Sequence, residues 1–420
     1  MTVENRTNDR APRLELGASK ELLGRAAQVD ATLAYSGYVL QRDRLVDGEY
    51  PVFAERASGA YVWDVDGNKY LDFILAYGTV ILGHADPVVS DAVAKEIRDG
   101  FAITLRKRVQ VELAELLTSV IPGAERVFLL KSGSDATSAA VRVSRAHTGR
   151  ERVIRWGYNG WHDWCANRPG GVPEQAQRVV STFRYNDLAS LEAEFERHPG
   201  EIACLLMMPF EVEPPEPGFL EAAAELAHRH GALFVLDEMR SGFRMSLGGA
   251  QETYGVSADL ITFSKAMANG YPISALVGNE RVMRTVGEVH IGSTFHVNGA
   301  EMAAAVATIT QLRDSPVLKH VEAIGKRFQE GLRAQVTTSG LDAEVVGVPQ
   351  MPFLRFTHQD EMARLRVQEA FYTETVRRGV LLHPNHHWYV CGAMTEQDID
   401  TALEATAAGF RAAETALRHG

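Results

Sequence analysis

The chain has few cysteines, and no stretch of it is both long and apolar. Cys165, Cys204 and Cys391 form no CxxC pair and show no spacing typical of a zinc site or a disulfide framework. We therefore expect a reducing compartment, the cytoplasm. Charged residues, glycine or proline interrupt every candidate for the roughly 20 apolar residues that span a bilayer, so we expect no membrane segment.

Positive charge is also scarce. The 43 Lys and Arg residues are outnumbered by 54 Asp and Glu residues, and the formal net charge is -11. Nucleic acids and anionic lipids bind clusters of Lys and Arg, so this balance argues against both as partners. The first 13 residues carry Glu4 and Asp9 and no apolar run, unlike a signal or transit peptide, and we expect a tail there.

The chain contains enough apolar residues for a large hydrophobic core. Its 420 residues are 45% hydrophobic, which favours two or three domains. From about Leu71 to Ala303, apolar runs alternate with Ala-rich stretches, a pattern typical of α/β proteins with a largely parallel sheet. The expected strands are 127–130, 153–155, 202–207, 233–236 and 260–263, and the expected helices are 135–147 and 220–230.

The two ends of the chain show a different pattern. Residues 19–33 favour a helix, and residues 61–73 alternate around Asp66-Gly67-Asn68, which predicts a hairpin. Past Ala304 the pattern predicts a smaller α+β region with a long helix (304–332), short strands (353–356 and 381–382) and a final helix (396–417). We expect an N-terminal segment over 1–70, a large cofactor-binding domain over 71–305 and a small domain over 306–420.

Two expected strands end in side chains that could act together on a cofactor. One strand ends at Asp237 and another at Lys265, and ligands of open α/β sheets bind beyond the carboxyl ends of the strands. Pyridoxal phosphate (PLP) needs such a pair: the lysine forms a Schiff base and shuttles a proton, and the aspartate keeps the ring nitrogen protonated. The alternative is a turn-capping Asp237 and a solvated Lys265. The small residues 266–270 favour the first interpretation, because they leave room for a bulky adduct.

Two further motifs fit the same cofactor. Residues 131–137 (KSGSDAT) lie between an expected strand and a helix, where the amides of Gly133 and Ser134 could bind phosphate. The alternative is a plain helix cap, with Ser134 or Asp135 at the N-cap. The aromatic turn at 157–164 offers Tyr158 for stacking on a planar ring, although such a cluster is equally typical of core or interface packing.

Taken together, these motifs resemble those of the class III PLP-dependent aminotransferases, and within them the branch of glutamate-1-semialdehyde aminomutase. The resemblance spans about residues 51–403. It implies fold type I, an α/β fold with a mostly parallel seven-stranded sheet in the large domain and a small α+β domain. Its most specific stretches are YVWDVDG (61–67), ILGHADP (81–87), SGSDA (132–136), PGFL (217–220), LDEMRSGFR (236–244) and FSKAMANG (263–270).

The resemblance also implies roles for particular residues. Lys265 corresponds to the Schiff-base lysine and Asp237 to the partner of the pyridine nitrogen. Gly133 and Ser134 correspond to the phosphate loop, and Tyr158 to the aromatic residue that stacks on the ring. Thr294 resembles a threonine that reaches the phosphate of the neighbouring subunit's cofactor, which implies a homodimer with shared active sites. Tyr77 resembles an aromatic residue of the substrate pocket. Plain packing is the alternative for Thr294 and Tyr77.

The chain departs from this family at positions that bear on the substrate. Asn159 stands where a histidine is usual, and Met208 replaces a usual glutamate, for which Glu211 could substitute. Arg42 falls near the place of a pocket arginine. The segment 383–388 lacks the arginine that often clamps an α-carboxylate, and its histidines favour a pocket wall or domain packing over a metal site.

We therefore expect a ping-pong aminotransferase of a biosynthetic pathway, acting on a small-molecule amino donor and a carbonyl acceptor. Lys265 would move a proton between the substrate and cofactor carbons. Two alternatives stay open: a 2,1-aminomutase of the glutamate-1-semialdehyde type, and a protein that keeps the fold without catalysis.

Overall fold

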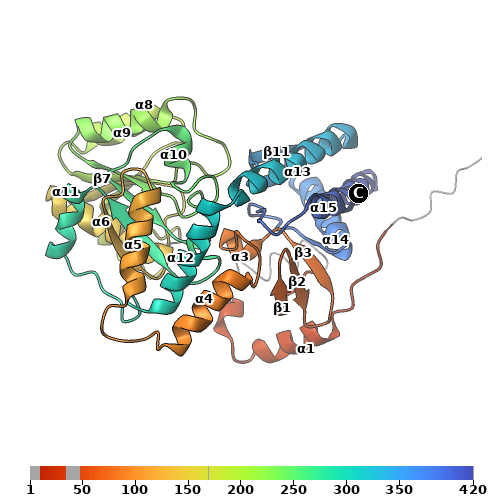
Figure 1. Ribbon diagram of the computed structural model, residues 1–420. Coiled ribbons are helices and arrows are strands. Elements are labelled where there is room, and N and C mark those ends of the chain that lie inside the picture. Colours follow the sequence, from red (N-terminus) through yellow and green to blue (C-terminus); the bar gives the residue numbers. More distant parts are fainter. Residues whose placement is uncertain (1–9, 35–47, 169, 420) are drawn as a thin grey trace, which may run out of the picture. The chain divides into compact units, whose positions relative to one another are not determined.

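The computed structural model describes residues 10–34, 48–168 and 170–419 (Figure 1). Contacts divide the chain into two compact units. Unit 1 comprises Met1–Tyr77, Leu82–Asp86 and Lys319–Gly420, and unit 2 comprises Gly78–Ile81 and Pro87–Leu318. Within the described ranges, no helix is long and apolar enough to cross a membrane.

Unit 2 is built on a seven-stranded sheet of order β4-β10-β9-β8-β7-β5-β6. Only β10 runs antiparallel to its neighbours, so the predicted mostly parallel sheet is confirmed. The five expected strands form, and β6 and β10 join them. The strands are β4 (Arg126–Leu130), β5 (Arg152–Trp156), β6 (Val180–Thr182), β7 (Ile202–Met207), β8 (Leu233–Asp237), β9 (Leu260–Phe263) and β10 (Ser274–Gly278).

Helices pack against this sheet, and its central strands β7, β8 and β9 are buried along their whole length. Ala136, Ala139 and Ala140 of α6 are buried in the core with leucines of the sheet, because small side chains let the helix approach closely. The helices of unit 2 are α4 (Pro87–Arg98), α5 (Arg108–Val120), α6 (Gly133–Thr148), α7 (Glu174–Arg178), α8 (Leu188–Arg197), α9 (Phe219–Arg229), α10 (Ala250–Tyr254), η2 (Lys265–Ala268), α11 (Glu280–Met283), η3 (Arg284–Glu288) and α12 (Gly299–Asp314).

The long helix predicted over residues 304–332 is wrong, because two helices occupy this part of the chain. Helix α12 ends at Asp314, and α13 (Val317–Ser339) begins after Pro316. Ser315 is extended, with φ -132° and ψ 165°. Proline disfavours a helical conformation in the residue before it and has no N–H to donate, so Pro316 separates the two helices.

Unit 1 contains a four-stranded sheet of order β1-β2-β3-β13 and a separate hairpin of β11 and β12. The predicted turn at Asp66-Gly67-Asn68 forms, and the Asp64 carboxylate accepts hydrogen bonds from the amides of Asp66 and Asn68. Its strands are β1 (Ala54–Ser58), β2 (Tyr61–Asp64), β3 (Lys69–Asp72), β11 (Ala343–Val348), β12 (Met351–Phe356) and β13 (Val380–Leu381). The remaining helices are α1 (Gly17–Ala26), η1 (Ala31–Ala34), α3 (Leu75–Gly78), α14 (Glu361–Arg377) and α15 (Glu396–Arg418).

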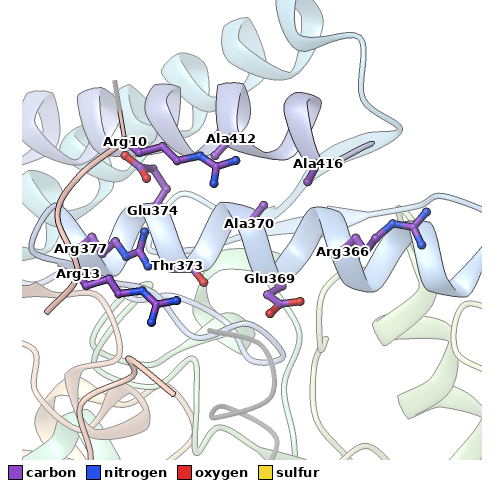
Figure 2. A pocket seen from close by; sticks show the side chains of 10 residues that line it. All are labelled: Arg10, Arg13, Arg366, Glu369, Ala370, Thr373, Glu374, Arg377, Ala412 and Ala416. Atoms are coloured by element: carbon purple, nitrogen blue, oxygen red, sulfur yellow. The ribbon is translucent and has the colours of Figure 1, made fainter. Parts of the chain in front are cut away.

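Residues 10–13 of the expected N-terminal tail are described, and they contact unit 1. Ala11 N donates a hydrogen bond to Glu374 Oε1 at 3.1 Å, which fastens this segment to α14. Figure 2 shows arginines of the segment and of α14 around a cavity of about 290 Å³. Residues 10–13 thus contact α14 without forming a helix or strand, and residues 1–9 lie outside the described part of the chain, so the tail stays a prediction.

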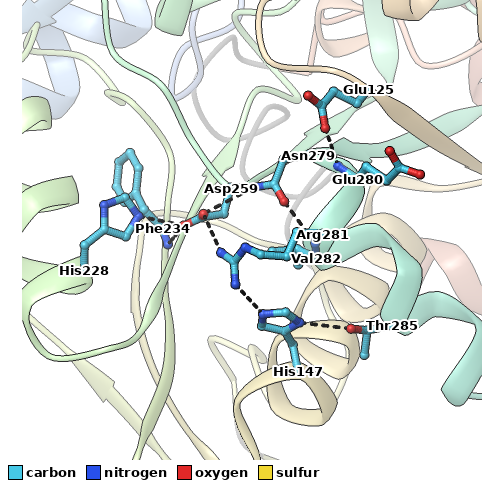
Figure 3. A network of polar contacts seen from close by, with 10 residues as sticks. All are labelled: Glu125, His147, His228, Phe234, Asp259, Asn279, Glu280, Arg281, Val282 and Thr285. Carbon is cyan, nitrogen blue, oxygen red and sulfur yellow. Dashed lines mark hydrogen bonds and ion pairs between the residues drawn. The ribbon is translucent and has the colours of Figure 1, made fainter.

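A polar network fixes the amino end of β9 (Figure 3). Asp259 Oδ2 accepts a hydrogen bond from Phe234 N at 2.9 Å and contacts His228 Nε2 at 2.7 Å. Arg281 connects Asp259 to His147 on α6. This network connects β8, β9 and α6 at the amino ends of the two strands.

Candidate active site

Asp237 and Lys265 lie at the carboxyl ends of adjacent parallel strands. Asp237 is the last residue of β8 and is only 1% exposed, and Lys265 follows β9 at the start of η2. Both line one cavity of about 180 Å³, as the sequence predicts. The other lining residues are Gly133, Ser134, Thr137, Tyr158, Asn159, Gly160, Met208, Met239, Arg240 and Ser264.

The backbone and the charge of Lys265 are both unusual. Its φ of 48° lies in the left-handed region, where a residue with a side chain is held at a cost in energy that is typical of functional positions. Burial lowers the pKa of Lys265 to about 7, and the positive charge of Arg240 acts in the same direction, while Asp237 opposes both. A substantial fraction of the amine is therefore neutral, and so nucleophilic, near neutral pH.

Asp237 is held by two hydrogen bonds. Asn159 Nδ2 donates to Asp237 Oδ2 at 2.9 Å, and Met239 N donates to Oδ1 at 3.2 Å. Burial raises the pKa of Asp237, and these two donors oppose that rise. A protonated ring nitrogen beside this carboxylate would supply the missing positive charge, so the residues present fit a pyridine cofactor.

The amino end of α6 forms another part of the cavity. Ser132 is the N-cap and shares a capping box with Asp135, so the alternative of an N-cap at Ser134 or Asp135 is wrong. This arrangement leaves Gly133 and Ser134 in the first turn, where both line the cavity. Gly160 approaches closely, and a Cβ there would lie 2.5 Å from Ser134 Oγ. Such a turn can hold a phosphate group at the helix terminus.

The walls of the cavity offer surfaces for a flat ring. Tyr158 lines it and is 55% exposed, and its aromatic ring is of the kind that stacks on planar groups. Met208 and Met239 contribute apolar atoms, and Met208 packs so closely on Gly157 that a Cβ there would lie 2.7 Å from its sulfur. The replacement of a family glutamate by Met208 therefore makes this wall apolar.

Thr294 and Tyr77 are not among the described residues that line the cavity. Thr294 is exposed in the segment before α12 and does not line the cavity. Tyr77 contacts the rings of His383 and His386 within unit 1, at centroid distances of 5.9 and 5.1 Å. Arg42 lies outside the described residues. The roles of these three residues stay predictions.

Arg240 is a cavity residue that sequence reasoning missed. It is 8% exposed, and its Nη1 donates to the backbone oxygen of Glu211 at 3.1 Å. Glu211 Oε1 lies 3.8 Å from Arg240 Nη2, so the predicted pocket carboxylate contacts a lining residue without lining the cavity itself. The only signal in the sequence is the position of Arg240, three residues after Asp237.

Comparison with known proteins agrees with this geometry. The family model for aminotransferase class-III matches residues 45–165 and 174–406. The chain belongs to this family, and the predicted membership is confirmed.

Three relatives show the range of the family. The chain is 41% identical over 368 residues to a 3-aminobutyryl-CoA aminotransferase of Cloacimonas acidaminovorans (strain Evry), covering 86% of this chain and 89% of the relative. It is 32% identical to a glutamate-1-semialdehyde 2,1-aminomutase of Acetivibrio thermocellus, covering 86% and 91%. The solved structure of the FumI protein of Sphingopyxis sp. MTA144, which carries PLP, has a TM-score of 0.88 at 32% identity, covering 94% and 95%.

The chain is accordingly a PLP-dependent class III aminotransferase of fold type I. The predicted enzyme class, fold and cofactor are confirmed, and the non-catalytic alternative is set aside.

Proposed function

We propose that the enzyme moves an amino group from a primary amine to a carbonyl acceptor in two half-reactions at the cavity of Lys265. The observation that carries this proposal is the pairing of a lysine of lowered pKa with a buried carboxylate at adjacent strand ends. PLP, when bound, supplies an electron-withdrawing ring that stabilises negative charge on the substrate carbon.

Residues of the cavity would bind the parts of PLP and transfer the proton. Lys265 Nζ would hold the aldehyde of PLP and, as a neutral amine, would accept the proton that leaves the amino-bearing carbon of the substrate and later give it back. Asp237 keeps a proton on the ring nitrogen, and Asn159 orients Asp237 through its 2.9 Å hydrogen bond. Gly133 and Ser134 bind the phosphate through the first turn of α6, and Tyr158 stacks on the ring.

We infer that the donor is an amine without a free carboxylate next to the amino-bearing carbon, of the 3-aminoacyl thioester class. The relative with 41% identity is a 3-aminobutyryl-CoA aminotransferase, whose substrate ends in a thioester. Segment 383–388 (HPNHHW) carries no arginine with which to bind an α-carboxylate, and Met208 makes one wall of the cavity apolar. Both features suit a donor that carries an uncharged substituent where an α-amino acid carries its carboxylate.

We further propose that the enzyme acts as a homodimer in the cytoplasm, in a biosynthetic pathway. The exposure of Thr294 outside its own subunit's cavity supports a role at the site of a partner subunit. Cys165 and Cys204 are buried free thiols, which suits a reducing compartment.

The test separates the two half-reactions. A ¹⁵N-labelled 3-aminobutyryl thioester of N-acetylcysteamine, added alone to the PLP-loaded enzyme, should transfer one amino group per site and change the cofactor absorbance. A carbonyl acceptor added afterwards should restore the spectrum and carry the label. The matched variant Lys265→Ala should do neither over repeated cycles.

Two results would contradict the proposal. Label that returns to the donor's own carbon skeleton would indicate an aminomutase. Repeated turnover by Lys265→Ala would remove the lysine from the mechanism.

A further inference from the structure

A second cavity of unit 2 borders the cofactor cavity. It has a volume of about 580 Å³ and is lined by residues of α6, of the segment after Gly160 and of the region before β6. Trp161 lines this second cavity, and its backbone N–H donates a hydrogen bond to Ser134 Oγ at 3.4 Å. Ser134 lines the cofactor cavity, so residues of the two cavities are in direct contact.

Trp161 gives the second cavity an aromatic surface. It is 71% exposed, whereas tryptophan is highly buried on average in folded proteins. Its ring meets the ring of His162 edge-on, with centroids 5.0 Å apart and an angle of 76° between the planes. Within the described ranges, no other aromatic ring packs against it. An exposed aromatic ring of this kind is a surface on which nucleotide bases stack.

Two arginines bring positive charge to the same cavity. Arg142 and Arg145 are three residues apart and so share one face of α6. In the described part of the chain, the side chain of Arg142 bonds only to the backbone oxygen of His290, and that of Arg145 only to the backbone oxygen of Glu151, both at 2.7 Å. Arg145 Nη2 is buried without a hydrogen-bond partner. Neither charge is paired with a described carboxylate, which favours a bound anion.

The cofactor cavity is too small to hold a thioester donor together with PLP. Its volume is about 180 Å³, whereas cavities that bind drug-sized ligands measure about 300–1,000 Å³. The part of the donor beyond its reacting end must therefore bind elsewhere. The second cavity lies within that size range, and Val141, Ala176 and Val179 add apolar atoms to its lining. Asp163 is the one carboxylate among its lining residues, against the two arginines.

We propose that the second cavity binds a phosphorylated nucleotide group at the far end of the thioester donor. This inference rests on the proposed function and names the part of the donor that lies outside the cofactor cavity. Trp161 stacks on the base, and Arg142 and Arg145 pair with phosphate oxygens through charged hydrogen bonds. The three residues determine specificity for the donor and take no part in proton transfer.

The first measurement is the binding of the nucleotide group alone. Adenosine 3′,5′-bisphosphate is titrated by calorimetry into PLP-loaded enzyme reduced with borohydride, in which the phosphate of PLP occupies the first turn of α6. The dissociation constant should rise about tenfold in Trp161→Ala and in Arg142→Gln. Adenosine, which has no phosphate group, should bind more weakly and depend on Trp161 alone. The control variant Arg126→Gln, which removes an exposed arginine of β4 outside the cavity, should bind both ligands as the wild type does.

The second measurement connects the cavity to the reaction. The enzyme is mixed with the 3-aminobutyryl thioester of coenzyme A or of pantetheine, which share the reacting group, and only the first carries a nucleotide. The change in the cofactor absorbance gives kcat/KM for each. The ratio of the two values should fall about tenfold in Trp161→Ala and in Arg142→Gln, and should keep the wild-type value in Arg126→Gln.

Two results would overturn the proposal. The first is a wild type that does not bind the bisphosphate, as expected if a second subunit covers Trp161, or whose binding is unchanged in both cavity variants. The second is a ratio of the two thioesters that is the same in every variant. The proposed function still stands if the wild type takes an amino group from the pantetheine thioester. If the wild type takes it from neither thioester, the proposed function fails instead.

Discussion

Burial determines the charge states of the two side chains proposed to act on the cofactor. Lys265 and Asp237 lie together in a region with little water, where each is pushed toward its neutral form and each partly restores the charge of the other. The site is therefore sensitive to any change in the charged or hydrogen-bonding groups around these two residues.

The lowered pKa of Lys265 predicts how cofactor capture depends on pH. Only the neutral amine attacks an aldehyde, so the rate at which apoenzyme captures PLP should rise through pH 7 and then level off. An ordinary lysine, with a pKa of about 10.4, would give a rate that keeps rising to much higher pH. Stopped-flow absorbance over pH 5.5–10 measures this profile, and a steady rise beyond pH 9 would be inconsistent with the structure. This pH range runs from about 1.5 units below the pKa of Lys265 to just below the pKa of an ordinary lysine.

Asn159 should determine how tightly the cofactor is held. Replacing it with alanine removes the 2.9 Å hydrogen bond to Asp237, which favours protonation of that carboxylate and weakens its hold on the ring nitrogen. Since hydrogen bonds to charged groups contribute about 1.5–3 kcal/mol, PLP affinity should fall at least tenfold. Equilibrium titration of apoenzyme with PLP measures the change. An unaltered affinity would show that the orientation of Asp237 does not depend on Asn159.

The sequence predicts residues whose roles follow from their position after a strand. It does not predict residues whose burial depends on contacts with backbone atoms far away in the chain. Lys265 and Asp237 could be predicted because each follows an apolar strand. The burial of Arg240 could not, because it depends on the backbone oxygen of Glu211, beyond the end of a different strand. Tyr77, Thr294 and Arg42 were assigned by resemblance alone, and their roles stay predictions.

Among the secondary-structure elements, α6 should link the stability of the protein to cofactor binding. Its first turn lines the cavity, and the Ser132–Asp135 capping box fixes that turn. Helix α15 carries the same type of box at Thr395 and Asp398, in unit 1. These two capping boxes are comparable, and residues of the first turn that follows Ser132 line the cavity.

Replacing either cap residue should destabilise the protein, but only one replacement should weaken cofactor binding. Ser132→Ala and Thr395→Ala should each lower the free energy of unfolding by about 0.5–2 kcal/mol. Ser132→Ala should also weaken PLP binding severalfold, because the amides of Gly133 and Ser134 lose their fixed orientation. Thermal unfolding of the apoenzyme and PLP titration measure the two effects. Equal PLP affinities in both variants would argue against α6 as the phosphate site.

The sequence does not predict elements whose formation depends on pairing with strands far away in the chain. Strand β10 follows Tyr271-Pro272 and forms between β4 and β9, which it pairs with in antiparallel orientation. No local feature distinguishes this short apolar run from a buried loop. Pro316, by contrast, was visible in the sequence and should have ended the predicted helix.

For the whole molecule, the proposed homodimer requires that Thr294 of one subunit contribute to the active site of the other. If Thr294 serves the partner's site, a mixed dimer of Lys265→Ala and Thr294→Ala subunits contains one site in which both residues are intact. At a PLP concentration too low for either homodimer to turn over, mixed and refolded subunits should regain activity. If the mixture is no more active than the two variant homodimers measured separately, Thr294 does not contribute to a shared site.

The central claim is that the amine of Lys265 holds the cofactor covalently. Reduction of the PLP-loaded enzyme with borohydride fixes the bond, and peptide mapping by mass spectrometry then locates it. The account predicts one phosphopyridoxyl group per chain, on Lys265. A label on any other residue, or no label at all, would contradict it.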